Sequence, residues 1–188
     1  MHERLTQLSD EDVAREALQD KEAFTALMTR YQDRLDRYLR RLGMGRLEDR
    51  QDVLQNIFLK VYRNLNGFDL HLRFSSWIYR IAHNETMSFF RSRKARPEAP
   101  PDDGDDILER IPAALDIEGD ANIMLDAKRV RKALDTLDPK YRDVLVLRFF
   151  EDRAYNEMSD ILRIPMGTVA TLLNRAKKKL HDAMMKTT

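Results

Sequence analysis

Apolar residues recur at the spacing of amphipathic helices along most of the chain, and no stretch alternates as a β-strand does. The clearest stripe predicts a helix from about 21 to 42. It consists of Phe24, Leu27, Met28, Tyr31, Leu35, Tyr38, Leu39 and Leu42. Gly43-Met44-Gly45 ends this helix. Ahead of it, Ser9-Asp10-Glu11-Asp12 has the pattern of a capping box that opens a short helix to about Leu18.

Two further helices are predicted in the first half, from about 47 to 65 and from about 75 to 93, with Asn66-Gly67 as the break between them. The first has an inward face of Val53, Leu54, Ile57, Phe58, Val61, Tyr62 and Leu65. The second is anchored by Trp77, Ile78, Ile81, Ala82, Phe89 and Phe90. Because Trp77 shares the spacing of Ile78 and Ile81, a core position is favoured over an exposed stacking platform.

A second helical stretch begins near 122, and its apolar face holds Ile123, Ala127, Val130, Leu134 and Leu137. Asp138-Pro139 supplies an N-cap and an N1 proline for the next helix, which carries Tyr141, Val144, Leu145 and Phe149. Two last helices, about 155–162 and 168–184, flank a turn at 163–167. The pattern predicts an all-α protein of two small helical domains, residues 1–96 and 122–188, joined by residues 97–121.

Charge is distributed unevenly, although 33 Lys and Arg against 32 Asp and Glu give a net charge of only +1. Residues 97–126 hold ten acidic residues and one basic residue, while residues 1–96 carry a net charge of +4 and residues 127–188 a net charge of +6. Prolines and like charges oppose regular structure in 97–121, so this stretch is predicted to be an extended acidic linker. Two basic domains remain compatible with a nucleic-acid partner.

Composition disfavours several classes of function. The chain has no cysteine, which excludes disulfides, thiol catalysis and cysteine-ligated zinc. No two of the histidines, His2, His71, His83 and His181, sit at ligand spacing on one helix, and there is no glycine-rich phosphate loop. No apolar run is long enough for membrane insertion, and the N-terminus lacks the apolar core of a signal peptide. We expect a cytoplasmic, non-enzymatic protein without metal, cofactor or small-molecule substrate.

The last two predicted helices have the spacing of a helix-turn-helix. Met158, Ile161 and Leu162 of the first can pack against Val169, Leu173, Ala176 and Leu180 of the second. The outward face of the second helix holds the DNA-binding candidates Thr168, Thr171, Asn174, Arg175 and Lys178. Asparagine can pair with adenine, arginine with guanine or phosphate, and lysine with phosphate. From spacing alone, a plain helical hairpin with a solvated, lysine-rich end remains the alternative.

Four segments together resemble the extracytoplasmic-function (ECF) sigma factors of the sigma-70 family. They are Ala23-Phe24 with Leu27 and Tyr31, then 52–62, then 74–84, then 155–169 with Arg175-Ala176-Lys177, and their order and spacing agree over about residues 10–184. The resemblance implies a sigma subunit that binds promoter DNA and core RNA polymerase, at its clamp and flap regions. It also implies an anti-sigma factor as a partner and reading of the minus-35 element by the helix-turn-helix. The linker either runs toward the RNA exit path, as in the family, or is a passive tether.

Residues 52–62 resemble the helix that docks on the polymerase clamp. The polymerase-binding candidates are its outward residues, Asp52, Gln55, Asn56, Leu59, Lys60 and Arg63. Such a mixed face suits a protein partner better than DNA, because Asp52 would repel phosphate. Without the resemblance, an ordinary solvated face is an equal alternative.

Residues 74–84 resemble the segment that opens and reads the minus-10 element. Strand opening needs pockets for flipped bases and cations along the displaced backbone. The candidates are Phe68, His71, Arg80, His83, Asn84, Arg91, Arg93 and Lys94. The resemblance implies that the loop 67–73 and the Asn84 position hold a flipped base of the non-template strand.

Three positions depart from the pattern of the family. Ser88 stands where an acidic residue is frequent, and Ala170 and Leu172 stand where basic residues are common. Fewer cations soften the salt dependence of DNA binding.

Two other functions stay open: a helix-turn-helix regulator whose N-terminal module dimerises or senses a signal, and a sigma-like polymerase adaptor that has lost promoter reading.

Overall fold

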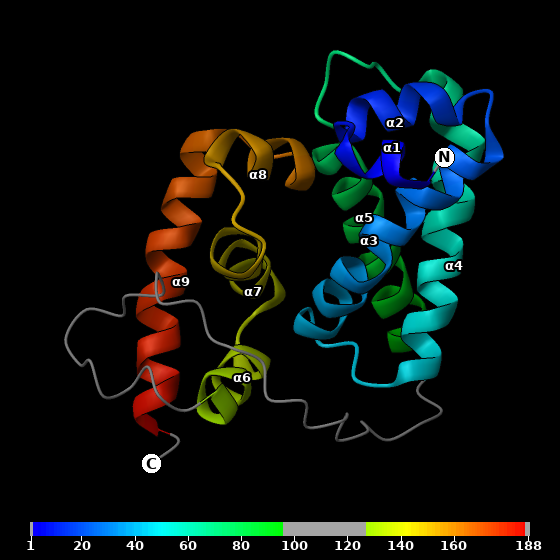
Figure 1. Cartoon of the computed structure of the whole chain (residues 1–188). Coiled ribbons are helices and arrows are strands. Elements are labelled where there is room, and N and C mark those ends of the chain that lie inside the picture. Colours follow the sequence, from blue (N-terminus) through cyan, green and yellow to red (C-terminus); the bar gives the residue numbers. More distant parts are fainter. Residues whose placement is uncertain (1, 96–126, 187–188) are drawn as a thin grey trace. The chain divides into compact units, whose positions relative to one another are not determined.

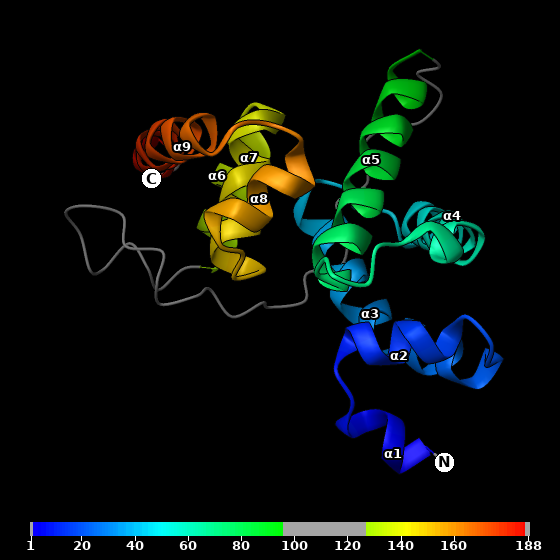
Figure 2. The ribbon, with the colours of Figure 1, turned by 90° about the horizontal axis from the view of Figure 1, so that it is seen from above.

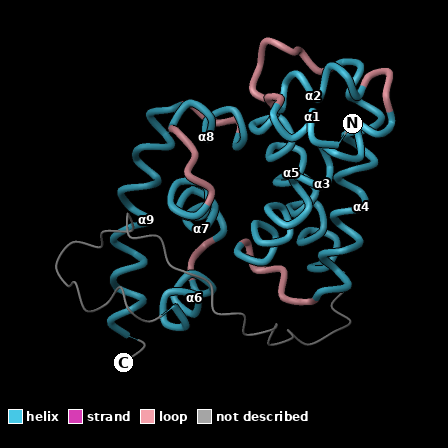
Figure 3. The backbone as a smooth tube through the Cα atoms, in the orientation of Figure 1, coloured by secondary structure: helices cyan, strands magenta, loops and turns pink. Residues whose placement is uncertain are grey.

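The computed structural model describes residues 2–95 and 127–186, and this part of the chain consists of helices joined by turns, without a strand (Figure 3). The predicted all-α fold class is therefore confirmed. The described residues form two compact units, one built mainly from α1–α5 and the other from α6–α9 (Figure 1). The predicted acidic linker 97–121 and the predicted helix start at 122–126 lie outside the described residues.

The N-terminal unit contains α1 (His2–Gln7), α2 (Asp10–Ala17), α3 (Lys21–Arg41), α4 (Leu47–Asn64) and α5 (Phe74–Ala95), with a 3-10 turn η1 (Leu65–Gly67) after α4. Helices α4 and α5 pack against each other at an angle, and α2 contacts α5 (Figures 1 and 2). The core is made of large side chains with no exposed surface, among them Leu27, Tyr31, Leu35, Tyr38, Ile57, Phe74, Ile78 and Tyr79. All but one of the stripe residues predicted for α3 are buried; Phe24 is half-buried.

Two helix ends follow the sequence signals. Ser9 is the N-cap of α2: its Oγ accepts a hydrogen bond from the Asp12 N–H at 3.1 Å and donates to the Asp12 carboxylate at 2.7 Å. The hydrogen bonds from Ser9 and Arg15 hold the pKa of Asp12 below its usual value. After α3, Gly43 has φ +101°, and the Met44 N–H donates to the Leu39 carbonyl at 3.2 Å.

Arg50 is a buried cation that periodicity did not single out. It is 6% exposed and lies in the first turns of α4. Its guanidinium donates to Asp36 Oδ1 at 2.8 Å and to the carbonyls of Gly45 at 2.5 Å and Met44 at 3.3 Å. These bonds tie the turn between α3 and α4 to both helices.

The C-terminal unit contains α6 (Ala127–Thr136), α7 (Pro139–Leu145), a π-helical segment η3 (Val146–Phe150), α8 (Tyr155–Leu162) and α9 (Met166–Lys186). The long α9 packs against α6, α7 and α8 (Figures 1 and 2). The core of the C-terminal unit includes Val144, Leu145, Met158, Val169, Leu173, Ala176 and Leu180. Asp138 takes the predicted N-cap position before Pro139, although its side chain makes no capping hydrogen bond.

Candidate functional site

Helix α4 buries one side and exposes the other. Val53, Ile57 and Val61 are at most 5% exposed. At about 100° per residue, the six polymerase-binding candidates lie within an arc of about 140° on the opposite side of the helix. All six are exposed: Asp52, Gln55, Asn56, Leu59, Lys60 and Arg63. Leu59 keeps 44% of its surface exposed, so the face has an apolar centre among polar side chains.

Two residues of α4 have partners that the sequence did not indicate. The Lys60 Nζ lies 2.5 Å from Glu85 Oε1 of α5, while the lysine side chain remains 54% exposed. Tyr62 was predicted to point inward, but it is 55% exposed, so that prediction is wrong. Tyr62 lies about 120° around the helix from the centre of the buried stripe. Its ring packs edge-on against Phe24 of α3, at 5.1 Å between centroids.

Tyr62 also lines a pocket of about 360 Å³ at the C-terminal end of α4. The lining residues come from two stretches of the chain, 17–21 and 62–66: Ala17, Leu18, Gln19, Lys21, Tyr62, Arg63, Leu65 and Asn66. Arg63 therefore belongs both to the exposed face of α4 and to this pocket. Helical periodicity could not find the pocket, because the fold alone brings the turn after α2 to the end of α4.

An aromatic cluster anchors the loop before α5. Phe68 is only 7% exposed, and its ring centroid lies 4.8 Å from that of Trp77 and 5.6 Å from that of Phe74. Phe68 was predicted to contact DNA; in this conformation its ring is packed inside the protein and holds the start of the loop. Trp77 belongs to the same cluster but is only half-buried, so it meets the prediction of a core position in part.

The tip of this loop is a short turn. The His71 N–H donates to Asp69 Oδ1 at 3.0 Å, and the Leu72 N–H donates to the Asp69 carbonyl at 2.9 Å. His71, Leu72 and Arg73 are exposed, and Leu72 keeps 54% of its surface exposed. The loop thus presents a cation, an imidazole and an apolar side chain from a backbone that is fixed by Asp69.

Most candidates on α5 share one face. Arg80, His83, Asn84, Arg91 and Lys94 lie within an arc of about 100°, opposite the side that Ile78 and Ala82 bury. Asn84, Arg91 and Lys94 are exposed. Arg91 donates to the Ser88 hydroxyl at 3.0 Å, so the departure at Ser88 gives this arginine a neutral neighbour.

Arg93 lies apart from that face. Its Nη1 is 2.9 Å from Asp49 Oδ2 of α4, and its guanidinium sits 6.0 Å from the Phe89 ring centroid. It is turned about 130° away from the arc of the other cations. The prediction grouped Arg93 with Arg91 and Lys94 because the three are close in sequence; the structure instead uses it to join α5 to α4.

Side chains brace the helix-turn-helix from within. The Glu157 carboxylate is buried and accepts a hydrogen bond from the Ala154 N–H at 3.0 Å, which closes the start of α8. Arg163 ends α8 in the left-handed conformation, with φ +57°. The Ser159 Oγ donates to the Ile164 carbonyl at 2.6 Å across the turn. The chain therefore enters α9 at a defined angle.

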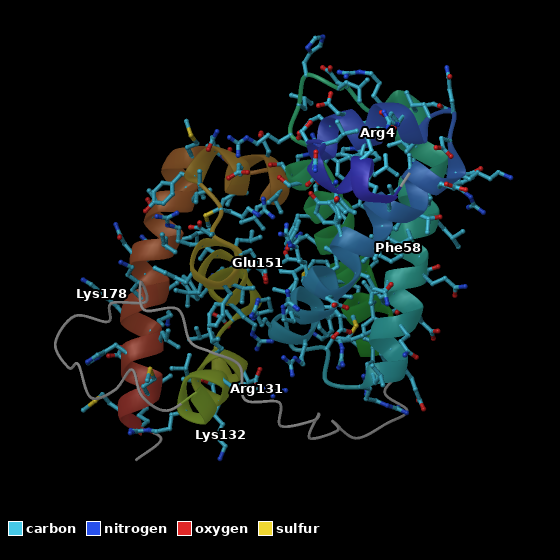
Figure 4. The ribbon with its side chains drawn as sticks, viewed as in Figure 1. Arg4, Phe58, Arg131, Lys132, Glu151 and Lys178 are labelled. Atoms are coloured by element: carbon cyan, nitrogen blue, oxygen red, sulfur yellow. The ribbon has the colours of Figure 1, made fainter. Side chains whose placement is uncertain are left out.

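The exposed face of α9 holds all five DNA-binding candidates within an arc of about 120°. Thr168, Thr171, Asn174, Arg175 and Lys178 are exposed, opposite the buried Val169, Leu173, Ala176 and Leu180. Lys178 points away from the rest of its unit (Figure 4). By contrast, Lys177 lies 5.5 Å from the Phe149 ring centroid and Lys179 lies 5.4 Å from that of Tyr141. The half-buried Ala170 and Leu172 flank this face instead of occupying its centre.

Comparison with known proteins assigns both units. Residues 27–96 match the model of sigma-70 region 2, and residues 127–180 match that of sigma-70 region 4. The chain is 31% identical to the ECF RNA polymerase sigma factor SigW of Bacillus subtilis, over 88% of this chain and 90% of the relative. It is also 31% identical to the RNA polymerase sigma-H factor of Pseudomonas aeruginosa, over 96% of both chains. The chain belongs to the ECF sigma factors.

Solved structures agree with this assignment at the level of the fold. CnrH in complex with the cytosolic domain of CnrY is 24% identical to this sigma factor, with a TM-score of 0.71 over 95% of this chain and 99% of that chain. RpoE in complex with the anti-sigma factor NepR from Bartonella quintana is 20% identical, with a TM-score of 0.61 over 81% of this chain and 91% of that chain.

The matched ranges contain every candidate residue of this sigma factor. The candidates on α4, in the loop and on α5 fall within the region 2 match, and those on α9 fall within the region 4 match. Within residues 2–95 and 127–186, no group of three or more His, Asp or Glu side chains could hold a metal ion. In the same residues, no helix has the length and apolar character needed to cross a membrane.

Proposed function

We propose that this sigma factor docks on the clamp of core RNA polymerase through the exposed face of α4. The observation that carries this proposal is the face itself, in which the exposed Leu59 lies among Asn56, Lys60 and Arg63. An exposed leucine ringed by polar side chains is typical of the centre of a protein interface. Asp52 at one end of the face disfavours DNA as the partner.

The loop 67–73 and the shared face of α5 are proposed to read and open the minus-10 element. His71 and Arg73 lie on the exposed loop, and Asn84 lies on the same face of α5 as Arg91 and Lys94. A flipped base needs hydrogen-bonding groups at its edge, and the displaced strand needs cations along its backbone. Arg93 and Phe68 support this surface without contacting DNA, because Arg93 pairs with Asp49 and Phe68 packs against Trp77.

The exposed face of α9 is proposed to read the minus-35 element from the major groove. Asn174 and Arg175 can contact base edges, while Thr168, Thr171 and Lys178 can contact phosphates. The lysine run contributes Lys178 within this face and the exposed Lys179 at its edge, whereas Lys177 is half-buried beside the Phe149 ring. The predicted departures at Ala170 and Leu172 are at the flanks of the face, so its polar centre is intact.

A cognate anti-sigma factor is proposed as a regulatory partner. Two solved structures with this fold are complexes, one with the cytosolic domain of CnrY and one with the anti-sigma factor NepR. A protein that covers the exposed face of α4 blocks polymerase docking. We place the protein in the cytoplasm, where its polymerase and promoters are, and assign it no catalytic activity, cofactor or small-molecule substrate.

The test is transcription by the reconstituted holoenzyme on a library of promoter fragments. Promoter-directed transcripts that require this chain support the proposal, and their absence from every fragment overturns it. Tight DNA binding by the isolated chain without a polymerase complex indicates the helix-turn-helix regulator instead. A stable polymerase complex that fails to retard promoter DNA indicates the adaptor.

A pair of variants tests the docking face. Leu59→Glu places a charge at the apolar centre of the face, and we expect at least a tenfold loss of affinity for core polymerase. Leu47→Glu is the matched control, since Leu47 is 51% exposed on the same helix but lies outside that face. Equal effects of the two substitutions contradict docking through Leu59.

A further inference from the structure

We infer that Glu11, on α2, is a positioning residue for promoter opening, because it holds the end of the minus-10 loop in place. This inference rests on the proposed role of the loop 67–73. Glu11 lies outside residues 27–96, the range that matches region 2, and it is not among the candidate DNA contacts. Its carboxylate acts on the loop through the backbone of Phe74.

The first step is the start of α5. The Trp77 N–H donates to the Arg73 carbonyl at 3.2 Å, so the helix begins directly after the exposed loop. The first N–H groups of a helix have no partner within it and need an acceptor from outside. Arginine has no acceptor in its side chain, so Arg73 cannot cap its own helix.

Glu11 supplies that acceptor from a distant part of the chain. The Phe74 N–H donates to Glu11 Oε1 at 2.9 Å, across 63 residues of sequence, at a partly buried position. A carboxylate at a helix N-terminus is favoured both by the helix dipole and by the charge-assisted hydrogen bond. The bond fixes where the loop ends.

The second step is the anchoring of α2 itself. Tyr31 of α3 donates through its hydroxyl to the Asp10 carboxylate, which also forms an ion pair with Arg30 at 2.7 Å. The ring of Tyr31 packs against the ring of Phe74, with 5.5 Å between centroids. Contacts therefore run from α2 to α3, from α3 to α5, and from α5 back to α2 through Glu11.

The loop is consequently held at both ends. Phe68 is fixed at its start by Trp77 and Phe74, and Glu11 fixes its end. Residues 69–73 lie between these anchors, and His71, Leu72 and Arg73 form their exposed tip. Without the carboxylate, the Phe74 N–H loses its acceptor, and the tip no longer has one position in which to receive a base.

The experiment compares two templates with the reconstituted holoenzyme. One is a duplex promoter fragment selected by the wild-type holoenzyme, and the other is the same fragment with its minus-10 segment mismatched and therefore already open. On the duplex template, we expect Glu11→Ala to lower open-complex formation about tenfold relative to wild type. On the premelted template, open-complex formation by Glu11→Ala should be within about twofold of wild type. Glu11→Gln keeps an acceptor oxygen without the charge, so its open-complex formation on the duplex template should lie between that of wild type and that of Glu11→Ala.

Two controls separate positioning from a general loss of structure. Glu16→Ala removes another carboxylate of α2, one that pairs at 2.6 Å with the exposed Arg4, and should leave both templates unaffected. Affinity for core polymerase should be unchanged in all three variants, since Glu11 and Glu16 are not on α4. A loss that is equal on both templates, or that follows weakened polymerase binding, overturns the inference.

A direct loop variant distinguishes this inference from the proposed function. His71→Ala should impair opening of the duplex fragment if the loop reads the minus-10 element. If His71→Ala impairs opening and Glu11→Ala opens the duplex as well as wild type does, only the role of Glu11 is overturned. Wild-type opening by His71→Ala overturns the proposed role of the loop, and the inference with it.

Discussion

Replacing Arg91, Arg93 or Lys94 with glutamine, one at a time, separates two kinds of cation at the end of α5. Arg91 and Lys94 lie on the face that carries Asn84, whereas Arg93 forms an ion pair with Asp49. Each lost phosphate contact makes the slope of log affinity against log salt shallower by about 0.7 to 0.9. Arg91→Gln and Lys94→Gln should each show this change, and Arg93→Gln should keep the wild-type slope.

The expected magnitudes are large enough to measure. For a slope change of about 0.8, a fourfold rise in salt narrows the affinity gap between wild type and variant about threefold. The side chains of Arg93 and Asp49 are 33% and 23% exposed, so breaking this pair should cost about 0.5–1 kcal/mol of folding stability. The assay is fluorescence anisotropy of the holoenzyme on labelled promoter DNA at several salt concentrations. A slope for Arg93→Gln as shallow as that for Arg91→Gln would refute the division of roles.

Three further predictions concern the scaffold. Arg50→Met leaves Asp36 and two backbone carbonyls without their donor, and should lower the free energy of unfolding by about 3 kcal/mol. The fluorescence of the single tryptophan, Trp77, reports unfolding of the N-terminal unit in urea, and an unchanged midpoint contradicts the prediction. Arg163→Gly relieves a left-handed residue and should stabilise the C-terminal unit by about 0.5–1 kcal/mol, while Arg163→Val should destabilise it, as measured by calorimetry. Ser9→Ala should cost about 1 kcal/mol near neutral pH. Because the pKa of Asp12 is lowered, the part of this difference that comes from its carboxylate is present above 3.8 and is lost as pH falls through the lower folded pKa. In urea titrations the difference between wild type and variant should therefore shrink at low pH, while the part due to the hydrogen bond from the Asp12 N–H to Ser9 remains.

Periodicity predicts the residues whose environment is set by their own helix. The buried stripe of α3 and the five outward candidates of α9 follow from helical spacing, and both are found as expected. Periodicity does not predict contacts that a residue makes with another helix or loop. Tyr62 lies about 120° from the centre of the buried stripe, and its ring packs edge-on against Phe24 of α3, a contact that no local pattern indicates. Glu11 acquires its role only when the fold brings α2 to the start of α5, which no local pattern encodes.

The same reasoning limits what a run of basic residues means in this chain. Neighbouring residues on a helix are turned by about 100° from one another, so three consecutive lysines cannot share one DNA-facing side. Lys177 is half-buried and lies near the Phe149 ring, whereas Lys178 is exposed within the face that holds Arg175 and Lys179 is exposed at the edge of that face, near the Tyr141 ring. In the N-terminal unit, Arg93 is likewise turned toward Asp49. We therefore expect fewer phosphate contacts than nearby cations, and a shallower salt dependence of DNA binding than the local charge suggests.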